Sequence, residues 1–179
     1  MVRERPDSKV TLFIHRLPFH VWTDNTRTPP GQFWSIQLPE IPAGPGLVAP
    51  PPTVQPQDWV LDTGNTGEAL AWRQHLVAAG LDPDMARVGF VGITSSLGGK
   101  KQFVPVRQAD LWLVSNIPSL ANSPFRLELF PGIPFRDVPQ NPDPQLQRPL
   151  IGMRALRRSG LLVELDYASD TVSIWTPNP

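Results

Sequence analysis

Proline is the feature that most constrains this chain, because it makes up 23 of the 179 residues, against an ordinary share of about 5%. The prolines are unevenly placed, with eleven among the first 56 residues and eight between residues 118 and 149. Proline donates no backbone hydrogen bond and breaks helix interiors, so dense proline indicates irregular chain. The two proline-poor blocks, residues 57–117 and 150–179, are therefore expected to hold most of the regular core.

The overall composition excludes several classes of protein. A hydrophobic fraction of 40% and six tryptophans are enough for a packed core, which argues against wholesale disorder. The 16 basic residues balance the 16 acidic ones, so we expect neither a nucleic-acid nor a membrane partner. The absence of cysteine excludes disulfides, a thiolate nucleophile and cysteine-based zinc sites. No stretch has the length and apolarity of a signal peptide or membrane span, which favours a cytoplasmic protein.

The proline-rich lead-in, residues 1–56, is predicted to be an N-terminal extension packed on the core. Its apolar and alternating segments predict one or two strands, at residues 10–14 and 33–38. The stretch 39–56, which contains three consecutive prolines, is typical of a linker or a long surface loop.

Residues 57–179 are predicted to form one domain that is mainly β, with one or two short helices and a proline-rich loop inserted at 131–149. Helical spacing of apolar residues predicts the first helix over 69–79, with Asn65 and Glu68 as a capping pair near its N-terminus. The other predicted elements are strands at 58–61, 87–93, 102–106, 111–114, 125–130, 161–167 and 171–175 and a helix at 153–158.

The sharpest local motif is the turn Asp62-Thr63-Gly64, which would arise by chance in roughly a few per cent of chains of this length. An Asp-Thr-Gly turn after a strand is also ordinary loop chemistry. Its surroundings make it more specific, because two apolar residues precede it and an expected helix follows. Downstream, the apolar pair and glycine at 150–152 lead into a second short helix, and a glycine-tipped hairpin lies between the two motifs.

This order of elements resembles the retropepsin-like aspartic proteases, especially the single-domain bacterial and cellular members, over about residues 57–176. The resemblance implies a closed β-barrel of the acid protease fold and a hydrolase that needs neither cofactor nor metal. It assigns Asp62 to the catalytic dyad, Thr63 to a hydrogen bond across the dimer interface, and Gly64 to a close approach of the backbone to the carboxylate. It further implies that the element at 150–152 packs beneath the catalytic loop. The flap that covers the substrate is assigned to Gly92, Ile93, Thr94, Ser95, Ser96, Leu97, Gly98 and Gly99.

Aspartic protease chemistry requires two facing carboxylates that share one proton and activate a water between them. The chain contains the Asp-Thr-Gly motif once and is too short for the two-lobed pepsin layout. We therefore expect a homodimer in which each subunit contributes Asp62 at the two-fold axis. Its substrate would be a peptide or protein bound in extended form under the flap.

Two other interpretations remain open. The first is a catalytically inactive, retropepsin-like binding or dimerisation module, because Asn65 stands where the family usually has Ala or Ser. The second is a β-rich protein in which the Asp-Thr-Gly motif is only a turn and the prolines serve as ligands for a partner.

The remaining polar candidates predict no second site. The three histidines are scattered without metal-ligand spacing, and His75 is predicted to lie on a helix surface. Asp82 and Asp84 flank Pro83 at the exit of the first helix, where the pattern favours a solvated turn over a pair of catalytic carboxylates.

Overall fold

The structure is a computed structural model. It describes residues 12–18, 20–24, 31–44, 55–94, 99, 101–115, 124–137, 148–169 and 171–176, and before residue 44 it describes only the backbone.

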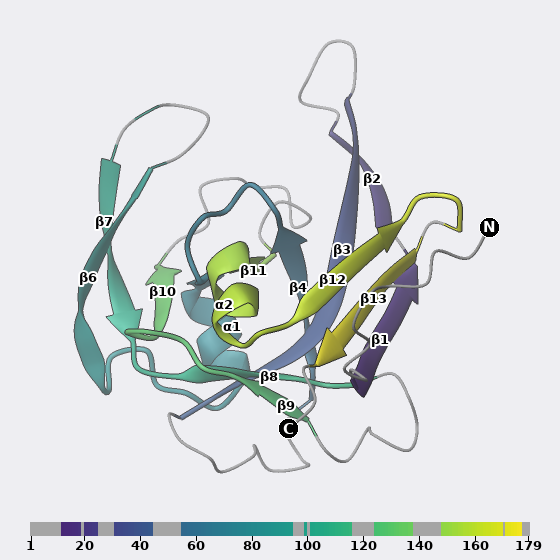
Figure 1. Ribbon diagram of the computed structural model, residues 1–179. Coiled ribbons are helices and arrows are strands. Elements are labelled where there is room, and N and C mark those ends of the chain that lie inside the picture. Colours follow the sequence, from purple (N-terminus) through teal and green to yellow (C-terminus); the bar gives the residue numbers. More distant parts are fainter. Residues whose placement is uncertain are drawn as a thin grey trace.

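The described residues are mainly β, as the sequence predicts, with two short helices among the strands (Figure 1). The strands are β1 (Leu12–Pro18), β2 (His20–Asp24), β3 (Gly31–Ala43), β4 (Gln57–Asp62), β5 (Ala69–Trp72), β6 (Arg87–Thr94), β7 (Lys101–Arg107), β8 (Asp110–Leu113), β9 (Phe125–Leu127), β10 (Ile133–Arg136), β11 (Leu150–Gly152), β12 (Leu162–Asp166) and β13 (Thr171–Thr176). The helices are α1 (Arg73–Ala78) and α2 (Met153–Arg158). The predicted hairpins β6–β7 and β12–β13 and the second helix are thereby confirmed.

Strand pairing in the described part of the chain follows an open path. The larger sheet has the order β6-β7-β10-β5-β11-β4-β3-β8-β9, with β2 paired to β3, and the smaller one has the order β1-β13-β12. The expected closed barrel is not found among these pairings. At one end β6 and β7 stand away from the rest as a two-stranded hairpin (Figure 1), and at the other β9 is only three residues long. The two ends of the path therefore do not meet.

The N-terminal extension contributes strands to both sheets. Within it, β1 pairs with β13 and β3 pairs in turn with β2, β4 and β8, giving three strands where one or two were predicted. The prediction that a loop begins at residue 39 was wrong, because β3 continues to Ala43 and Pro39 pairs with Asp58. Successive parts of β3 pair mainly with one neighbouring strand each. A proline, which has no N–H to donate, can therefore be accommodated where its nitrogen faces the unpaired side of the strand.

The predicted loop at 131–149 also contains a strand, β10. It pairs parallel with β5 and antiparallel with β7, and its residues Ile133 and Phe135 are fully buried. Burial of these two side chains supplies the driving force that outweighs the neighbouring prolines. Residues 138–147 of the same insertion lie outside the described part of the chain.

The first predicted helix is shorter than expected, because residues 69–72 form β5 and the helix spans only Arg73–Ala78. Strand β5 lies between β10 and β11 and pairs with both. Its ladder bonds and burial thus override the helical spacing of the apolar residues, since tertiary context outweighs local propensity. Asn65 consequently caps no helix; the residue that precedes α1 is Trp72.

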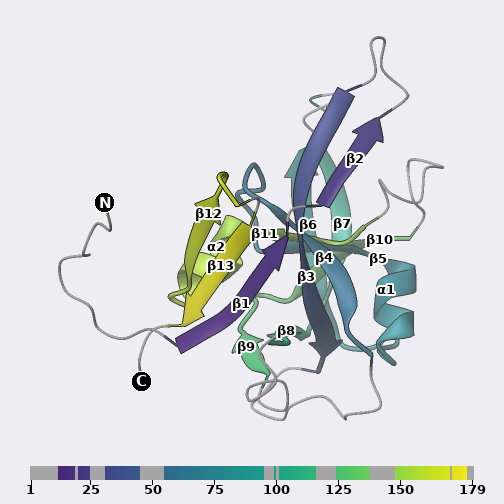
Figure 2. The ribbon, with the colours of Figure 1, turned by 90° about the vertical axis from the view of Figure 1, so that its right-hand side faces the viewer.

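The two helices lie on opposite sides of the sheet around β4, with α2 beside the smaller sheet and α1 on the far side (Figure 2). The main cluster of buried side chains joins these layers and includes Trp59, Leu61, Leu76, Leu111, Phe135, Ile151, Leu156 and Ile174. None of the helices in the described ranges has the length and apolarity required to traverse a bilayer.

Candidate active site

Asp62 is the last residue of β4 and opens the loop that leads to β5. The backbone N–H of Gly64 donates to Asp62 Oδ1 over 3.0 Å, and the N–H of Asn65 donates to the Asp62 carbonyl oxygen over 3.0 Å. A Cβ on Gly64 would lie 3.3 Å from the same carboxylate oxygen, so glycine permits this close approach. Asp62 is half-buried, whereas Thr63 and Gly64 are exposed. The loop thus presents a carboxylate at the protein surface.

Strand β11 lies between the two strands that the Asp62 loop connects. It runs parallel to β4, with Gly152 in register with Asp62, and antiparallel to β5. A Cβ on Gly152 would lie 2.3 Å from the carbonyl oxygen of Gly67, a backbone atom that cannot easily move aside. The expected contact between the Leu-Ile-Gly element and the loop is therefore present, and it requires glycine.

The first turn of α2 is hydrogen-bonded to the same loop. The first N–H groups of a helix have no partner within the helix and need acceptors from elsewhere. Loop carbonyl groups accept from three successive residues: Gly152 donates to Glu68 (2.7 Å), Met153 to Asn65 (3.1 Å) and Arg154 to Gly67 (3.2 Å).

Asn65, which departs from the family pattern, shapes the loop itself. Its Oδ1 accepts a hydrogen bond from the N–H of Gly67 over 2.8 Å, a side chain-to-backbone turn typical of asparagine. In the structure the Asn65 side chain therefore contacts the backbone of its own loop.

Glu68, at the end of the loop, was predicted only as the capping partner of Asn65, which is wrong because the N-cap of α1 is Trp72. It is buried, with 6% of its surface exposed. One carboxylate oxygen pairs with Arg158 Nη2 of α2 over 2.5 Å, and the other accepts from the N–H of Phe130. The guanidinium group of Arg158 also lies 5.7 Å from the centre of the Phe130 ring. No local pattern could have revealed this pair, because its members are 90 residues apart.

The hairpin assigned to the flap is formed by β6 and β7, paired from Arg87–Arg107 to Thr94–Lys101. Of the predicted flap residues, Gly92, Ile93 and Thr94 lie on β6, and Gly99 is exposed with a φ of +64°. The predicted flap residues Ser95, Ser96, Leu97 and Gly98 fall outside the described part of the chain. In Figure 1, β4 ends on the same side of the molecule as the end of β6 and the start of β7.

The two faces of this hairpin differ in burial. Val104 and Val106 are buried against the rest of the protein, whereas Phe90 and Phe103 are 69% and 68% exposed. The ammonium group of Lys101 lies 5.2 Å from the centre of the Phe103 ring. The outer face is therefore apolar and partly covered by one lysine.

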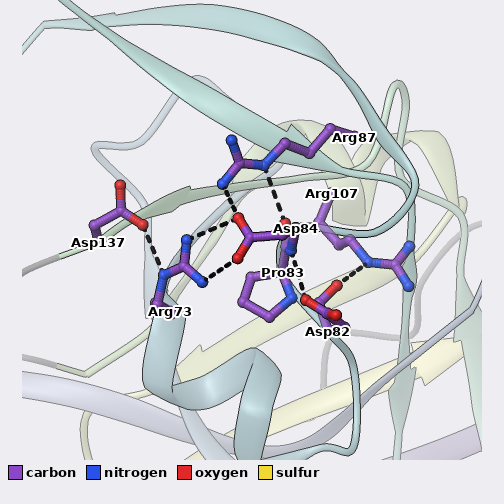
Figure 3. A network of polar contacts seen from close by, with 7 residues as sticks. All are labelled: Arg73, Asp82, Pro83, Asp84, Arg87, Arg107 and Asp137. Carbon is purple, nitrogen blue, oxygen red and sulfur yellow. Dashed lines mark hydrogen bonds and ion pairs between the residues drawn. The ribbon is translucent and has the colours of Figure 1, made fainter.

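The turn around Asp84 carries a second arginine–carboxylate cluster (Figure 3). Asp84 accepts two hydrogen bonds from Arg73, of 2.8 and 3.0 Å, and pairs also with Arg87. Arg73 in turn donates to Asp137 over 2.7 Å. The hydrogen bonds from Arg73 lower the pKa of Asp84, and those to Asp84 and Asp137 raise the pKa of Arg73. Asp82 and Asp84 are exposed, as predicted, while Pro83 between them is buried. The Asp84 carboxylate is held by two arginines that the sequence did not indicate.

His75 lies on α1, as predicted, but it is half-buried rather than fully on the helix surface. Its Nδ1 accepts a hydrogen bond from the N–H of Trp72 over 3.2 Å. Burial lowers the pKa of His75 to about 4. The imidazole is thus an uncharged acceptor at neutral pH.

Within the described ranges, His, Asp and Glu side chains form no group of three or more that could hold a metal ion. Comparison of the chain with models of protein families, with curated proteins and with solved structures gives no match. The residues themselves and their geometry are therefore what indicates a function.

Proposed function

We propose that this chain is an aspartic endopeptidase with a retropepsin-like fold, active as a homodimer. Asp62 of each subunit would form the catalytic dyad. The substrate would be a peptide or protein segment in extended conformation, bound between the Asp62 loops and the β6–β7 hairpins.

The observation that carries the proposal is the arrangement around Asp62. A half-buried carboxylate stands at the end of a strand, in a loop whose flanking strands enclose β11. Gly152 and the first turn of α2 hold that loop through hydrogen bonds and close packing. A rigid loop of this kind is what catalysis requires, because a catalytic group must be fixed in position before the substrate binds.

In the proposed mechanism the two Asp62 carboxyl groups share one proton, since two like charges so close together cannot both be ionised. The ionised carboxylate removes a proton from a bound water, which attacks the carbonyl carbon of the scissile peptide bond. The protonated carboxyl group acts as the acid and donates its proton as the peptide bond breaks.

The N–H of Gly64 supports this role of Asp62. Its hydrogen bond to Oδ1 fixes the orientation of the carboxyl group. Thr63 is exposed beside it and is proposed to make the hydrogen bond to the partner loop across the two-fold axis.

The proposal is tested with a pooled peptide library incubated from acidic to neutral pH with the wild type, Asp62→Asn and Asp58→Asn. Asp58 is a matched control, because it lies on the same strand but is exposed and pairs only loosely with Arg148, at 3.8 Å. We expect cleavage by the wild type and Asp58→Asn and none by Asp62→Asn. Circular dichroism and gel filtration verify that all three fold and assemble alike.

Two results would contradict the proposal. Cleavage that survives in Asp62→Asn would exclude Asp62 as the catalytic residue. Absence of cleavage in every protein at every pH would exclude the peptidase and favour the non-catalytic binding or dimerisation module.

A further inference from the structure

We propose that the ion pair between Glu68 and Arg158 is a positioning element that fixes the conformation of the Asp62 loop. The structural part of this inference is independent of any activity. Its consequence for catalysis rests on the proposed function.

Glu68 connects three segments that are distant in the sequence. Its backbone carbonyl accepts from the N–H of Gly152 at the start of α2, and its carboxylate pairs with Arg158 in the last turn of the same helix. The second carboxylate oxygen accepts from the N–H of Phe130. The end of the Asp62 loop is therefore tied to both ends of α2 and to the segment that leads into β10.

Burial makes this connection strong. The side chain of Glu68 is 5% exposed, whereas that of Arg158 is 41% exposed. A buried carboxylate must keep its partners, because an unpaired charge away from water is strongly disfavoured. Any movement of the loop that separated Glu68 from Arg158 or Phe130 would leave such a charge, so the pair restricts the loop to one arrangement.

The chain supplies a matched control in Asp110. Its side chain is 3% exposed and pairs with Arg126 over 2.9 Å, and its other oxygen accepts from the N–H of Leu129 over 3.1 Å. Glu68 and Asp110 thus bind neighbouring amides of one segment and one arginine each. They differ in that Glu68 belongs to the Asp62 loop and Asp110 does not.

The test is amide hydrogen exchange in the wild type, Glu68→Gln and Asp110→Asn. We expect exchange at the amides of Gly67, Gly152 and Met153 to become at least about tenfold faster in Glu68→Gln, because local opening of the loop becomes easier. Exchange of the amides of the buried β13 residues Val172 and Ile174, on a strand that carries neither substitution, reports global opening and is used to normalise the rates. In Asp110→Asn the normalised rates at the loop should stay within about twofold of the wild type.

The inference is overturned if Glu68→Gln leaves the normalised loop exchange unchanged, or if Asp110→Asn accelerates it equally. Arg158→Met should reproduce the effect of Glu68→Gln, and Arg158→Lys, which keeps the positive charge, should restore most of the protection. These arginine variants keep the test decisive if Glu68→Gln folds poorly.

A cleavage assay adds the catalytic readout. If the proposed function holds, Glu68→Gln should lower kcat by about tenfold or more with little change in KM, since a misplaced carboxylate weakens the chemical step more than substrate binding. If the wild type cleaves nothing, the proposed function fails, while hydrogen exchange still decides whether the ion pair positions the loop.

Discussion

Asp84 and Glu68, two of the carboxylates that arginine side chains bind in this protein, show how differently such contacts hold a structure. Asp84, in the turn after α1, is engaged by two arginines, but its side chain is 58% exposed. Glu68, at the end of the Asp62 loop, is engaged by one arginine and is 5% exposed. Exposed ion pairs are weakened by solvent and salt, whereas breaking a buried pair leaves a charge without water. Burial rather than the number of partners is therefore what anchors a loop.

The two regions also differ in how their backbones are held. The Asp62 loop is bonded to the start of α2 and packs against Gly152 without space for a methyl group. The Asp84 turn is held by the N–H of Asp84, which donates to Asp82 Oδ1 over 2.8 Å, and by flexible arginine side chains: Arg107 donates to the Asp82 carbonyl oxygen over 2.9 Å and Arg87 to that of Pro83 over 3.2 Å (Figure 3). We expect the first region to be rigid and the second to tolerate change.

The largest effect in this comparison is expected from Gly152→Ala. The added methyl group would meet backbone atoms of the Asp62 loop at 2.3 and 2.8 Å, so the loop or α2 must shift. We expect the free energy of unfolding to fall by about 3 kcal/mol, as measured by urea denaturation. Gly44→Ala, where a Cβ would meet nothing within 4 Å, should change it by less than about 0.5 kcal/mol. Equal effects of the two substitutions would contradict the close packing described for Gly152.

A smaller but substantial effect is expected from Glu68→Gln. The variant keeps the size of the side chain but removes the charge that faces Arg158, and we expect a loss of about 2 kcal/mol in urea denaturation. Because Arg158 is itself 41% exposed, it can be rehydrated, which keeps the loss below that of a fully buried pair. If the free energy of unfolding falls no more in Glu68→Gln than in Asp84→Asn, the proposed difference between the two carboxylates is refuted.

The free energy of unfolding should depend on pH through His75 on α1, the helix that precedes the Asp84 turn. The pKa of His75 is lowered to about 4 by burial, so the unfolded chain binds a proton as the pH falls through 6.5 while the folded protein does not. Stability should therefore decrease between pH 6.5 and about 4, by about 1–2 kcal/mol because solvent still reaches the half-buried imidazole. His75→Gln, which keeps an acceptor for the N–H of Trp72, should lose less stability than the wild type between pH 7 and pH 4.5. An identical pH dependence of the two proteins would refute the assignment to His75.

The smallest effect is expected from Asp84→Asn. Its partners Arg73 and Arg87 are partly exposed, and water can replace the lost carboxylate. The melting temperature should fall by no more than a few degrees, and the difference from the wild type should shrink as salt is added. A large decrease that persists at high salt would mean that this exposed cluster holds α1 as firmly as Glu68 is proposed to hold the Asp62 loop.

Sequence patterns sufficed for the elements whose signals are local. Alternation and turn residues predicted the hairpins β6–β7 and β12–β13, and the apolar pairs before Asp62 and Gly152 predicted β4 and the entry into α2. The contact between Gly152 and the Asp62 loop followed from the family resemblance and is present in the fold.

Other features depend on partners that are remote in the sequence. Residues 69–72 have helical spacing, yet they form β5 because two strands flank them. Pro39 and Pro134 occur within strands because pairing with neighbouring strands outweighs the loss of a proline N–H. Glu68 and Arg158 are 90 residues apart, and no local pattern marks either one as a partner of the other.

The central claim, a dyad built from one Asp62 of each subunit, is tested most directly by subunit mixing. Wild type and Asp62→Asn chains are unfolded together, refolded at varying ratios and constant total concentration, and assayed for peptide cleavage. If each active dimer needs both carboxylates, activity should fall with the square of the wild-type fraction, because mixed dimers are inactive. A linear decrease would contradict the account, because it would mean that a single Asp62 suffices for cleavage.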